Sequence, residues 1–490
     1  MMKLKEYLTP FFFGFIGIFA FAPFSLKPLI ILSYAYLIKE LSFKSSSTRQ
    51  LIMWSIGHWG FGMSWLIVSV YYYGETSIAI SLIIFVLLIL ILTLFFSLPL
   101  LVIRTNFFQD LRYSSLKYIL LVISIFVLNE WSMYYLLNGV PWLIPGVVFL
   151  DTFTQNIYPL LGVAGASIII YLCSTLLAIS WHKNKKNLFI LCLISLVFFI
   201  PNFYKRVSVG EQINISIVQP SSDPFLKYTN NYKLEIEANL KELINLASAS
   251  SSLIVLPEAE LPYVYKSANF KKFESDINTD QTIIGGVWHL SEGNLYNSMV
   301  NFQSQQIYNK IHLVPFGEYI PFISSLRGLI SFFDMPMSDV FKGKSNQNPM
   351  VFDTQSLKKM APLICFDIAF GNTVRKSNIS SLFMVNISND TWFGKSIGPY
   401  QHLDIARVRT IENNKWMIRA TNDGFSALID NNGTIVDKLE KGVTDVLDGS
   451  IMLLDKRTIY SQYGYYLPYL LALFILLISV IIRLCLKKQY

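Results

Sequence analysis

Three short stretches decide the fold of this chain: LIVLPEAELP at Leu253–Pro262, YNKIHLVPFGEYIP at Tyr308–Pro321 and APLICFDIAF at Ala361–Phe370. The first and third are apolar runs typical of buried strands, and each ends abruptly on a reactive side chain, Glu258 or Cys365. Side chains in such positions lie at the carboxyl edge of a sheet. The second stretch carries Lys310 after a polar turn. A carboxylate, an ammonium and a thiol together predict an acyl-transfer site, because the thiol needs a base and the tetrahedral oxyanion needs a positive donor.

Each of these side chains also has an ordinary structural explanation. Taken alone, Cys365 would be a small core residue, Glu258 a solvated loop carboxylate and Lys310 a surface lysine. His312 is a further candidate base for a cysteine–histidine pair, although the apolar run that follows it favours packing for its ring. The similar strand-edge setting of the three groups favours chemistry over the structural explanations.

The composition indicates an integral membrane protein. The 490 residues are 53% hydrophobic and 15% charged, with a mean hydropathy of +0.45, whereas soluble domains carry about 25% charged residues. The net charge of +8 does not indicate nucleic-acid binding, because Lys and Arg stand between apolar spans rather than on one polar face. Without a CxxC or HExxH pattern, neither a metal nor another cofactor is expected. Cys365 is the one cysteine of four outside the apolar spans, which argues against a disulfide framework and for a free thiol.

Eight apolar spans are expected to cross the membrane, at about 7–24, 28–41, 51–73, 78–103, 117–137, 158–181, 187–203 and 466–486, since about 20 apolar residues cross the hydrocarbon core. The first span resembles a signal peptide. Because Pro23 follows its small-residue site and further spans come after it, a retained helix is expected. Glu130 lies inside the fifth span and is either a functional carboxylate or one paired with a neighbouring helix.

The basic residues of the short loops predict the orientation of these spans. One set of loops holds nearly all of them: Lys3, Lys5, Lys39, Lys44, Arg49, Arg104, Arg112, Lys117, Lys183, Lys185, Lys186, Lys487 and Lys488. The alternate loops hold Lys27 and little else, so the first set and both termini are expected in the cytoplasm. Residues 1–204 would then form a transmembrane domain of seven helices, 205–462 an extracytoplasmic catalytic domain, and 463–490 a terminal helix with a basic cytoplasmic tail.

The segment 205–462 alternates strand and helix patterns. INISIVQP, SLIVLPE, TIIGGVW, APLICFD, SLFMVNIS and SALIDNNG read as strands. Residues 231–247 have the periodicity of an amphipathic helix. This alternation predicts a layered α/β domain.

The quoted stretches resemble the nitrilase superfamily, in which Glu, Lys and Cys stand in this order along the chain. With the membrane spans included, the resemblance narrows to the apolipoprotein N-acyltransferase family and covers essentially the full length. Further motifs carry it: FAPF at Phe21–Phe24, NGVPW at Asn138–Trp142, FFDMPMSDVFKG at Phe332–Gly343, ISNDTWFGKSIGPYQH at Ile387–His402 and RATNDG at Arg419–Gly424. The resemblance implies an eight-helix transmembrane domain and a nitrilase-like αββα sandwich.

The resemblance also implies the roles of individual residues. Glu258 would be the general base, Lys310 the oxyanion stabiliser and Cys365 the nucleophile, while Glu318 would help to orient the lysine and the base. Glu318 could instead be a carboxylate that begins a helix.

Three positions of this chain depart from the family pattern. Where the family usually has Tyr and Glu after the nucleophile, this chain has Phe366 and Asp367. Tyr228 stands where the family often has a Trp in a mobile arm over the site.

The implied reaction is a ping-pong acyl transfer. A membrane phospholipid would acylate Cys365, and the thioester would pass the acyl chain to the N-terminal amine of a diacylglyceryl apolipoprotein. Aromatic residues would keep water from the thioester, or else would anchor loops at the membrane interface or pack in the core: Trp142, Phe332, Phe333, Trp392 and Phe393. The implied location is the bacterial inner membrane with a periplasmic catalytic domain. A monomer is expected, although the sequence does not fix the oligomeric state.

Two other functions fit parts of the pattern. One is a membrane-tethered nitrilase-type amidase acting on a small amide, for which eight spans are more than a tether needs. The other is a transporter or receptor whose outer domain binds a ligand. Only the enzymes require Cys365, so replacement of this cysteine by serine separates them from the binding protein.

Overall fold

The computed structural model describes residues 2–42, 48–73, 77–109, 111, 115–183, 185–223, 226–228, 230–277, 280–315, 318–319, 340–353 and 357–487. Their contacts divide the chain into two compact units. The first comprises 1–67, 77–204 and 463–490, and the second comprises 68–76 and 205–462. The short segment 68–76 belongs to the second unit although residues 68–73 end the predicted span 51–73, a division that the sequence did not predict.

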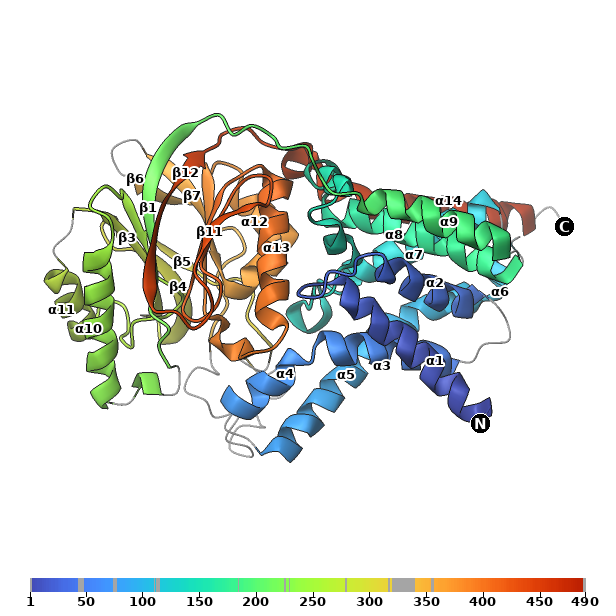
Figure 1. Cartoon of the computed structure of the whole chain (residues 1–490), viewed down its shortest axis with the longest axis horizontal. Helices are drawn as coiled ribbons and strands as arrows, with labels where there is room; N and C mark the ends of the chain where they lie inside the picture. The colour runs from blue at the N-terminus through green and yellow to red at the C-terminus, as the bar shows by residue number, and fades with distance from the viewer. Residues whose placement is uncertain are drawn as a thin grey trace. The chain divides into compact units, whose positions relative to one another are not determined.

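The first unit is helical (Figure 1). Its helices are α1 (Met2–Gly17), α2 (Leu29–Ser42), α3 (Thr48–Gly62), α4 (Trp65–Val68), α5 (Ile78–Leu100), α6 (Asn106–Gln109), α7 (Leu116–Ser132), α8 (Tyr158–Lys183), α9 (Lys185–Leu196) and α14 (Leu467–Lys487). Gly162 interrupts α8 with a left-handed φ of 66°, which glycine adopts without strain. Each of the eight predicted spans coincides with helical structure.

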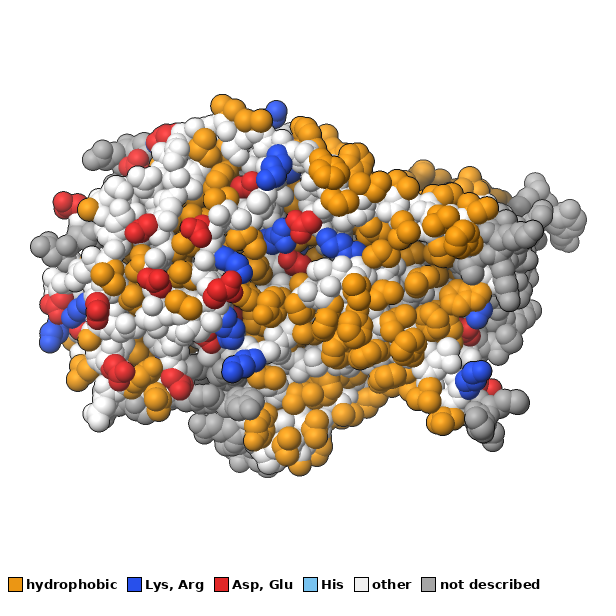
Figure 2. All heavy atoms as spheres, viewed as in Figure 1, with side chains coloured by type: hydrophobic (Ala, Val, Ile, Leu, Met, Phe, Trp, Pro, Cys, Tyr) orange, Lys and Arg blue, Asp and Glu red, His pale blue; other side chains and the backbone are white. Residues whose placement is uncertain are grey.

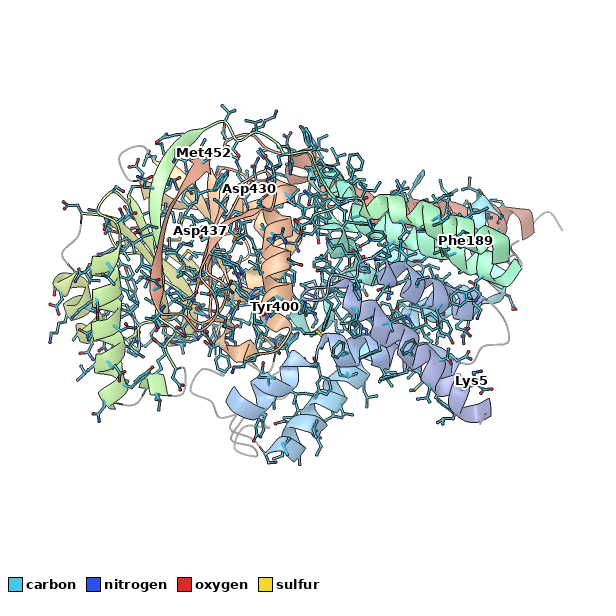
Figure 3. The ribbon with its side chains drawn as sticks, in the orientation of Figure 1. Lys5, Phe189, Tyr400, Asp430, Asp437 and Met452 are labelled. Atoms are coloured by element: carbon cyan, nitrogen blue, oxygen red, sulfur yellow. The ribbon has the colours of Figure 1, made fainter. Side chains whose placement is uncertain are left out.

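Apolar side chains cover much of the surface of these helices (Figure 2). On α5 the exposed residues include Ile83, Leu87 and Leu94, and Phe189 of α9 points outward in Figure 3. A water-facing helix would present polar residues here, so this surface suits a lipid environment.

Not every helix meets the length and composition of a full crossing. Two described segments do, Ile78–Arg104 and Phe153–Trp181, and the bent pair Thr48–Gly62 with Trp65–Tyr71 makes a third when taken as one span. The helices at 189–199 and 467–483 are apolar but shorter. A helical domain with apolar helices is therefore established, and eight crossings remain a prediction.

The second unit contains two six-stranded sheets among its described residues (Figure 1). The first sheet has the order β12-β1-β2-β3-β4-β5, with β1 (Glu211–Gln219), β2 (Leu253–Val255), β3 (Thr282–Ser291), β4 (Asn294–Asn301), β5 (Ile307–Asn309) and β12 (Asp445–Leu453). The second has the order β11-β10-β9-β8-β7-β6, with β6 (Met350–Asp353), β7 (Lys358–Ile364), β8 (Phe383–Ser388), β9 (Met417–Thr421), β10 (Ala427–Ile429) and β11 (Ile435–Lys438).

The sheets pack face to face because their strands alternate. Ile215 and Ile217 of β1 enter the core between the sheets with Val385 of β8, whereas Val218 belongs to the core beneath the helices of the first sheet. Helices α10 (Asn230–Leu246) and α11 (Ala268–Asp276) cover that outer face. Helices α12 (Gly371–Ser377) and α13 (Gly398–Asn413) cover the second sheet (Figure 1). The result is the predicted αββα sandwich.

Parallel strands at the centre of both sheets bring the predicted residues to one edge. In the first sheet, β1, β2 and β3 are parallel neighbours, and in the second β7, β8 and β9 are. Glu258 follows β2, and Cys365 directly follows β7. The six predicted strands and the helix at 231–247 are present. The strands β4, β5, β6, β9, β11 and β12 were not predicted.

Candidate active site

Glu258 is positioned by the pairing of β2 with β3. The Leu256 amide continues the ladder by donating to the Ile284 carbonyl at 2.8 Å. Gly286 allows a very close approach, since a Cβ built there would lie 2.3 Å from Ala259 N and 2.6 Å from Glu258 Cα. Ala259 then turns the chain with a left-handed φ of 45°. The carboxylate therefore stands at a turn that only glycine on the neighbouring strand permits.

Lys310 follows β5 and turns its ammonium to two carboxylates. Its amide donates to the Asn297 carbonyl at 2.8 Å. The buried Nζ lies 2.9 Å from Oε1 of Glu258 and 2.9 Å from Oε1 of Glu318. Burial opposes the charged form, but the two carboxylates outweigh it and raise the pKa of Lys310 well above its ordinary value. The two carboxylates thus favour the charged form of Lys310 within the site.

The amide of Asn297, on β4, completes this cluster. Its Nδ2 donates to Oε1 of Glu258 at 2.7 Å and to Oε1 of Glu318 at 3.0 Å. The other oxygen of Glu318 accepts from the Val314 amide at 2.9 Å. Asn297 was not among the predicted site residues. The available signal was an amide in the buried half of a strand, where a polar group requires partners.

The second oxygen of Glu258 is held from the other sheet. Oε2 accepts a hydrogen bond from the backbone amide of Asn389 at 2.8 Å. Asn389 follows β8 and lies within the ISNDTWFGKSIGPYQH motif. Both carboxylate oxygens are therefore anchored, one by side chains of the first sheet and one by the backbone of the second.

Cys365 begins the 3₁₀ helix η11 (Cys365–Ala369) with a φ of 46°, in a region that residues other than glycine rarely adopt. Burial raises the pKa of its thiol well above the ordinary range, Glu258 adds to the rise, and Lys310 opposes it. All three residues are buried, Lys310 contacts Glu258, and Asp367 ties the turn of Cys365 to the Ile311 and His312 amides next to Lys310. We therefore assign Glu258, Lys310 and Cys365 to one candidate site. A neutral thiol at rest also means that nucleophilic attack requires a base.

Asp367 joins the nucleophile turn to the loop of the lysine. Its Oδ1 accepts from the amides of Ile311 at 3.2 Å and His312 at 2.8 Å. Its Oδ2 accepts from the Tyr308 hydroxyl at 3.1 Å and the Ile364 amide at 3.2 Å. Burial raises the pKa of Asp367 to about 7, against the effect of these hydrogen bonds. The carboxylate is occupied by structural donors, so it organises the backbone on both sides of the site.

Phe366 and His312 both pack against Phe370. The ring of Phe366 meets it edge to face at 5.3 Å between centroids, and that of His312 stacks on it at 3.5 Å. Nε2 of His312 lies 2.7 Å from the Thr373 hydroxyl, and burial lowers the pKa of His312 to about 3. This environment fits the packing interpretation of His312 better than that of a catalytic base.

The remaining predicted residues are more widely distributed. Trp392 lies in the 3₁₀ helix η12 (Asp390–Phe393), 37% exposed, and its carbonyl accepts from the Ser69 hydroxyl at 2.8 Å. Trp142 belongs to the first unit, where it is buried with its ring 5.5 Å from that of Trp65. Tyr228 ends the 3₁₀ helix η8 (Leu226–Tyr228), and its side chain lies outside the described residues, as do Phe332 and Phe333.

Glu130 is buried on α7 and accepts a hydrogen bond from the Tyr171 hydroxyl of α8 at 2.9 Å. This is the arrangement of a carboxylate paired with a neighbouring helix. Across the described part of the chain, His, Cys, Asp and Glu do not gather in groups of three that could hold a metal ion.

A sandwich of two sheets with Glu, Lys and Cys at one edge defines the carbon–nitrogen hydrolase class, and the family model described as "Carbon-nitrogen hydrolase" matches residues 214–457. A second model, described as "Apolipoprotein N-acyltransferase N-terminal domain", matches residues 13–176. With both models matched and a full-length relative 30% identical, the chain belongs to the apolipoprotein N-acyltransferase family.

Individual relatives extend this match over the whole length. The apolipoprotein N-acyltransferase of Haemophilus influenzae is 30% identical over 100% of this chain and 97% of its own length. That of Pseudomonas syringae pv. tomato is 32% identical over 91% of this chain and 90% of its own. Among solved structures, a CN-hydrolase superfamily protein from Xanthomonas campestris covers 49% of this chain and 91% of its own, with 18% identity and a TM-score of 0.37.

Proposed function

We propose that this chain moves an acyl chain from a membrane phospholipid, through a thioester on Cys365, to the N-terminal amine of the diacylglyceryl cysteine of an apolipoprotein. The observation that supports this best is the buried cluster in which Lys310 Nζ bridges Glu258 and Glu318 at 2.9 Å beside the thiol. Family membership supports the acceptor, since the relatives are named for the acylation of apolipoproteins.

In the first half-reaction Glu258 takes the proton of the Cys365 thiol while the sulfur bonds to the ester carbonyl carbon. Two of the three N–H donors of Lys310 face carboxylates in the described part of the chain, and the third is available for the oxyanion. When the carbon–oxygen ester bond breaks, the proton on Glu258 passes to the departing alkoxide. The products are a lysophospholipid and a thioester.

In the second half-reaction the α-amine of the acceptor attacks the thioester carbonyl. Glu258 accepts a proton from the amine, the carbon–sulfur bond breaks, and the sulfur regains a proton to restore the thiol. The same lysine stabilises the second oxyanion. Water must be excluded while the thioester waits, because hydrolysis would waste the acyl group. Trp142 and Trp392 are proposed to contact the lipid substrates, and Tyr228 to cover the site.

The proposal includes a topology. Eight helices cross the bacterial inner membrane, both termini lie in the cytoplasm, and residues 205–462 form the periplasmic catalytic domain. The uneven distribution of Lys and Arg over the loops supports this orientation. The chain is proposed to act as a monomer, with donor and acceptor both arriving as membrane lipids.

The intact mass of the purified chain after incubation with phospholipid alone tests the reaction. The expected result is one added acyl group that maps to Cys365 and disappears when a diacylated lipopeptide is added. Cys365→Ser is the matched control and should give neither the thioester nor the product. An unmodified wild-type chain, an acyl group on another residue, or normal lipopeptide acylation by Cys365→Ser would exclude the proposal.

A further inference from the structure

The carbonyl of the nucleophile contacts a buried histidine. Cys365 keeps its left-handed φ of 46° while its carbonyl oxygen lies 3.4 Å from Nε2 of His402. His402 is 1% exposed and lies one turn into α13, the helix on which Figure 3 labels Tyr400. A strained residue persists only where its surroundings hold it, and this contact acts at the strained residue itself.

The ring of His402 is fixed in turn by a buried ion pair. Nδ1 lies 3.0 Å from Oδ1 of Asp390 and 3.1 Å from Nη2 of Arg419. Arg419 Nη2 also bonds to Oδ2 of Asp390 at 2.7 Å, and the Ser388 hydroxyl donates to Oδ1 of Asp390 at 2.7 Å. Asp390 and Arg419 are fully buried, so they cannot contact substrate in this conformation. Burying two charges is costly, and such a pair adds little stability over an apolar substitute.

The network shares a loop with the base. The Asn389 amide donates to Oε2 of Glu258 at 2.8 Å, and the next residue, Asp390, holds Arg419. Because the Cys365 carbonyl can only accept, Nε2 of the neutral His402 ring carries the hydrogen and Nδ1 accepts from Arg419, so Asp390 orients the ring through this arginine. One loop therefore reaches Glu258 through its backbone and Cys365 through His402. A shift of this loop would move the base relative to the thiol.

We propose that His402 and Asp390 are positioning residues that set the separation between the Glu258 carboxylate and the Cys365 thiol. The inference rests on the proposed use of these two groups as base and nucleophile. Proton transfer from the thiol depends steeply on their separation, so a small displacement slows acyl-enzyme formation without changing phospholipid binding.

A second contact from α13 separates the positioning of Cys365 by His402 from the attachment of the nucleophile turn, η11, to this helix. Arg409, two helical turns after His402, donates from Nε to the Ile368 carbonyl at 2.9 Å and from Nη2 to the Ala369 carbonyl at 2.7 Å. The far end of the nucleophile turn is thus tied to α13 independently of His402. Loss of His402 should therefore leave the turn attached while Cys365 itself loses its partner.

Two substitutions of His402 each keep the contacts of one ring nitrogen and remove those of the other. In His402→Gln the amide nitrogen can take the place of Nε2 and still donate to the Cys365 carbonyl. In His402→Asn the shorter side chain can face Asp390 and Arg419 but does not reach Cys365. His289→Asn is the matched control, because this histidine is partly buried on β3 and its ring lies 5.9 Å from that of Tyr265.

The rate of acyl addition to Cys365 is measured by intact mass in the full-length chain at a series of phospholipid concentrations, with thermal unfolding in parallel. His402→Gln and His289→Asn should stay near the wild-type rate. His402→Asn should lose about tenfold or more in the saturated rate, with the half-saturating concentration unchanged.

The possible results decide between the two proposals. If the wild-type chain gives no adduct on Cys365, the proposed function and this inference both fail. If the wild-type chain reacts, a wild-type rate for His402→Asn, or equal losses in both variants at 402, overturns the inference alone. Should His402→Asn not fold, His402→Leu fills the space of the ring, keeps both members of the Asp390–Arg419 pair and removes the contact with the Cys365 carbonyl. It should still slow the saturated rate, whereas an unchanged rate overturns the inference.

Discussion

Lys310 Nζ lies 2.9 Å from Oε1 of Glu258, and both side chains are buried. Glu318 shares the same nitrogen at 2.9 Å, and the Asn297 amide bonds to both carboxylates. The base and the lysine therefore depend on each other for more than catalysis. Without the ammonium, the buried carboxylate of Glu258 and the partly buried one of Glu318 would face one another across a single amide.

Replacement of Lys310 should affect activity and stability separately. Lys310→Met should lose about a hundredfold or more in acyl transfer, as loss of an oxyanion donor does. It should also lose roughly 3–5 kcal/mol of stability, because breaking a buried ion pair leaves a charge uncompensated. Lys310→Met with Glu318→Gln should regain much of the stability but none of the activity. Turnover and thermal unfolding in detergent measure the two effects, and wild-type turnover by the double variant would exclude the oxyanion role.

The pH dependence of Cys365 alkylation should report the charges around the sulfur. Because burial and Glu258 raise the pKa of the thiol, the rate with iodoacetamide should increase about tenfold per pH unit up to pH 9 without levelling off. Glu258→Gln removes a charge that raises this pKa and should speed alkylation at a given pH. Lys310→Met removes a positive charge that lowers the pKa of the thiol, and should therefore slow alkylation. Both variants should nevertheless lose acyl transfer.

The reaction is followed at the Cys365 peptide by mass spectrometry, with Cys365→Ser as the control for labelling elsewhere. Slower alkylation in Glu258→Gln would contradict the electrostatic account of the site. A plateau near neutral pH in the wild-type chain would show a preformed thiolate and remove the need for a base.

Asp367 should tolerate neither an amide nor the longer carboxylate without loss. In Asp367→Asn an NH₂ group replaces one carboxylate oxygen, such as the one that accepts from the Tyr308 hydroxyl and the Ile364 amide. The Ile364 N–H then lacks an acceptor, which should cost about 1–3 kcal/mol of stability. Asp367→Glu restores the family's usual residue but adds a methylene in a packed interior, at about 1–3 kcal/mol. Thermal unfolding and acyl-enzyme formation check both variants. Wild-type stability of Asp367→Asn would show that the carboxyl group is protonated in the native state.

Much of the site could be predicted because parallel strands end at the same edge. The apolar runs before Glu258 and Cys365 indicated strands, and the structure brings both residues to that edge with Lys310. Asn297 could not be found in this way, because its contact with Glu258 depends on the antiparallel register of β4 with β3 and β5. The contact of Asn389 with Glu258 uses a backbone amide, which any residue except proline would supply, so the sequence does not indicate it.

The network behind the nucleophile was missed for a related reason. Helix α13 buries charged and polar residues, among them His402 and Arg409, so it shows no apolar stripe at helical spacing. Strand β9 carries the fully buried Arg419 at its centre and does not read as an apolar strand. Buried polar residues thus conceal these two elements in the sequence.

A second buried ion pair lies next to the base. Lys227 Nζ donates to the Ala259 carbonyl and lies 3.5 Å from Oε2 of Glu260, and both side chains are nearly inaccessible. Burial lowers the pKa of Lys227 and raises that of Glu260, so it opposes the charge on each partner. Because Ala259 directly follows Glu258, the lysine also holds the turn that presents the base.

Substitution of this pair should separate its effect on stability from its effect on the rate. Lys227→Met should cost roughly 3–5 kcal/mol, because Glu260 is left buried without its partner. Lys227→Met with Glu260→Gln should recover most of that loss, yet acyl-enzyme formation should stay about tenfold slow because the Ala259 carbonyl still lacks its donor. Thermal unfolding and intact mass with phospholipid measure the two quantities on the same samples. If the double variant reacted at the wild-type rate, the bond from Lys227 to the Ala259 carbonyl would have no part in positioning Glu258. If Lys227→Met were as stable as the wild type, the Lys227–Glu260 pair would carry no charge in the folded chain.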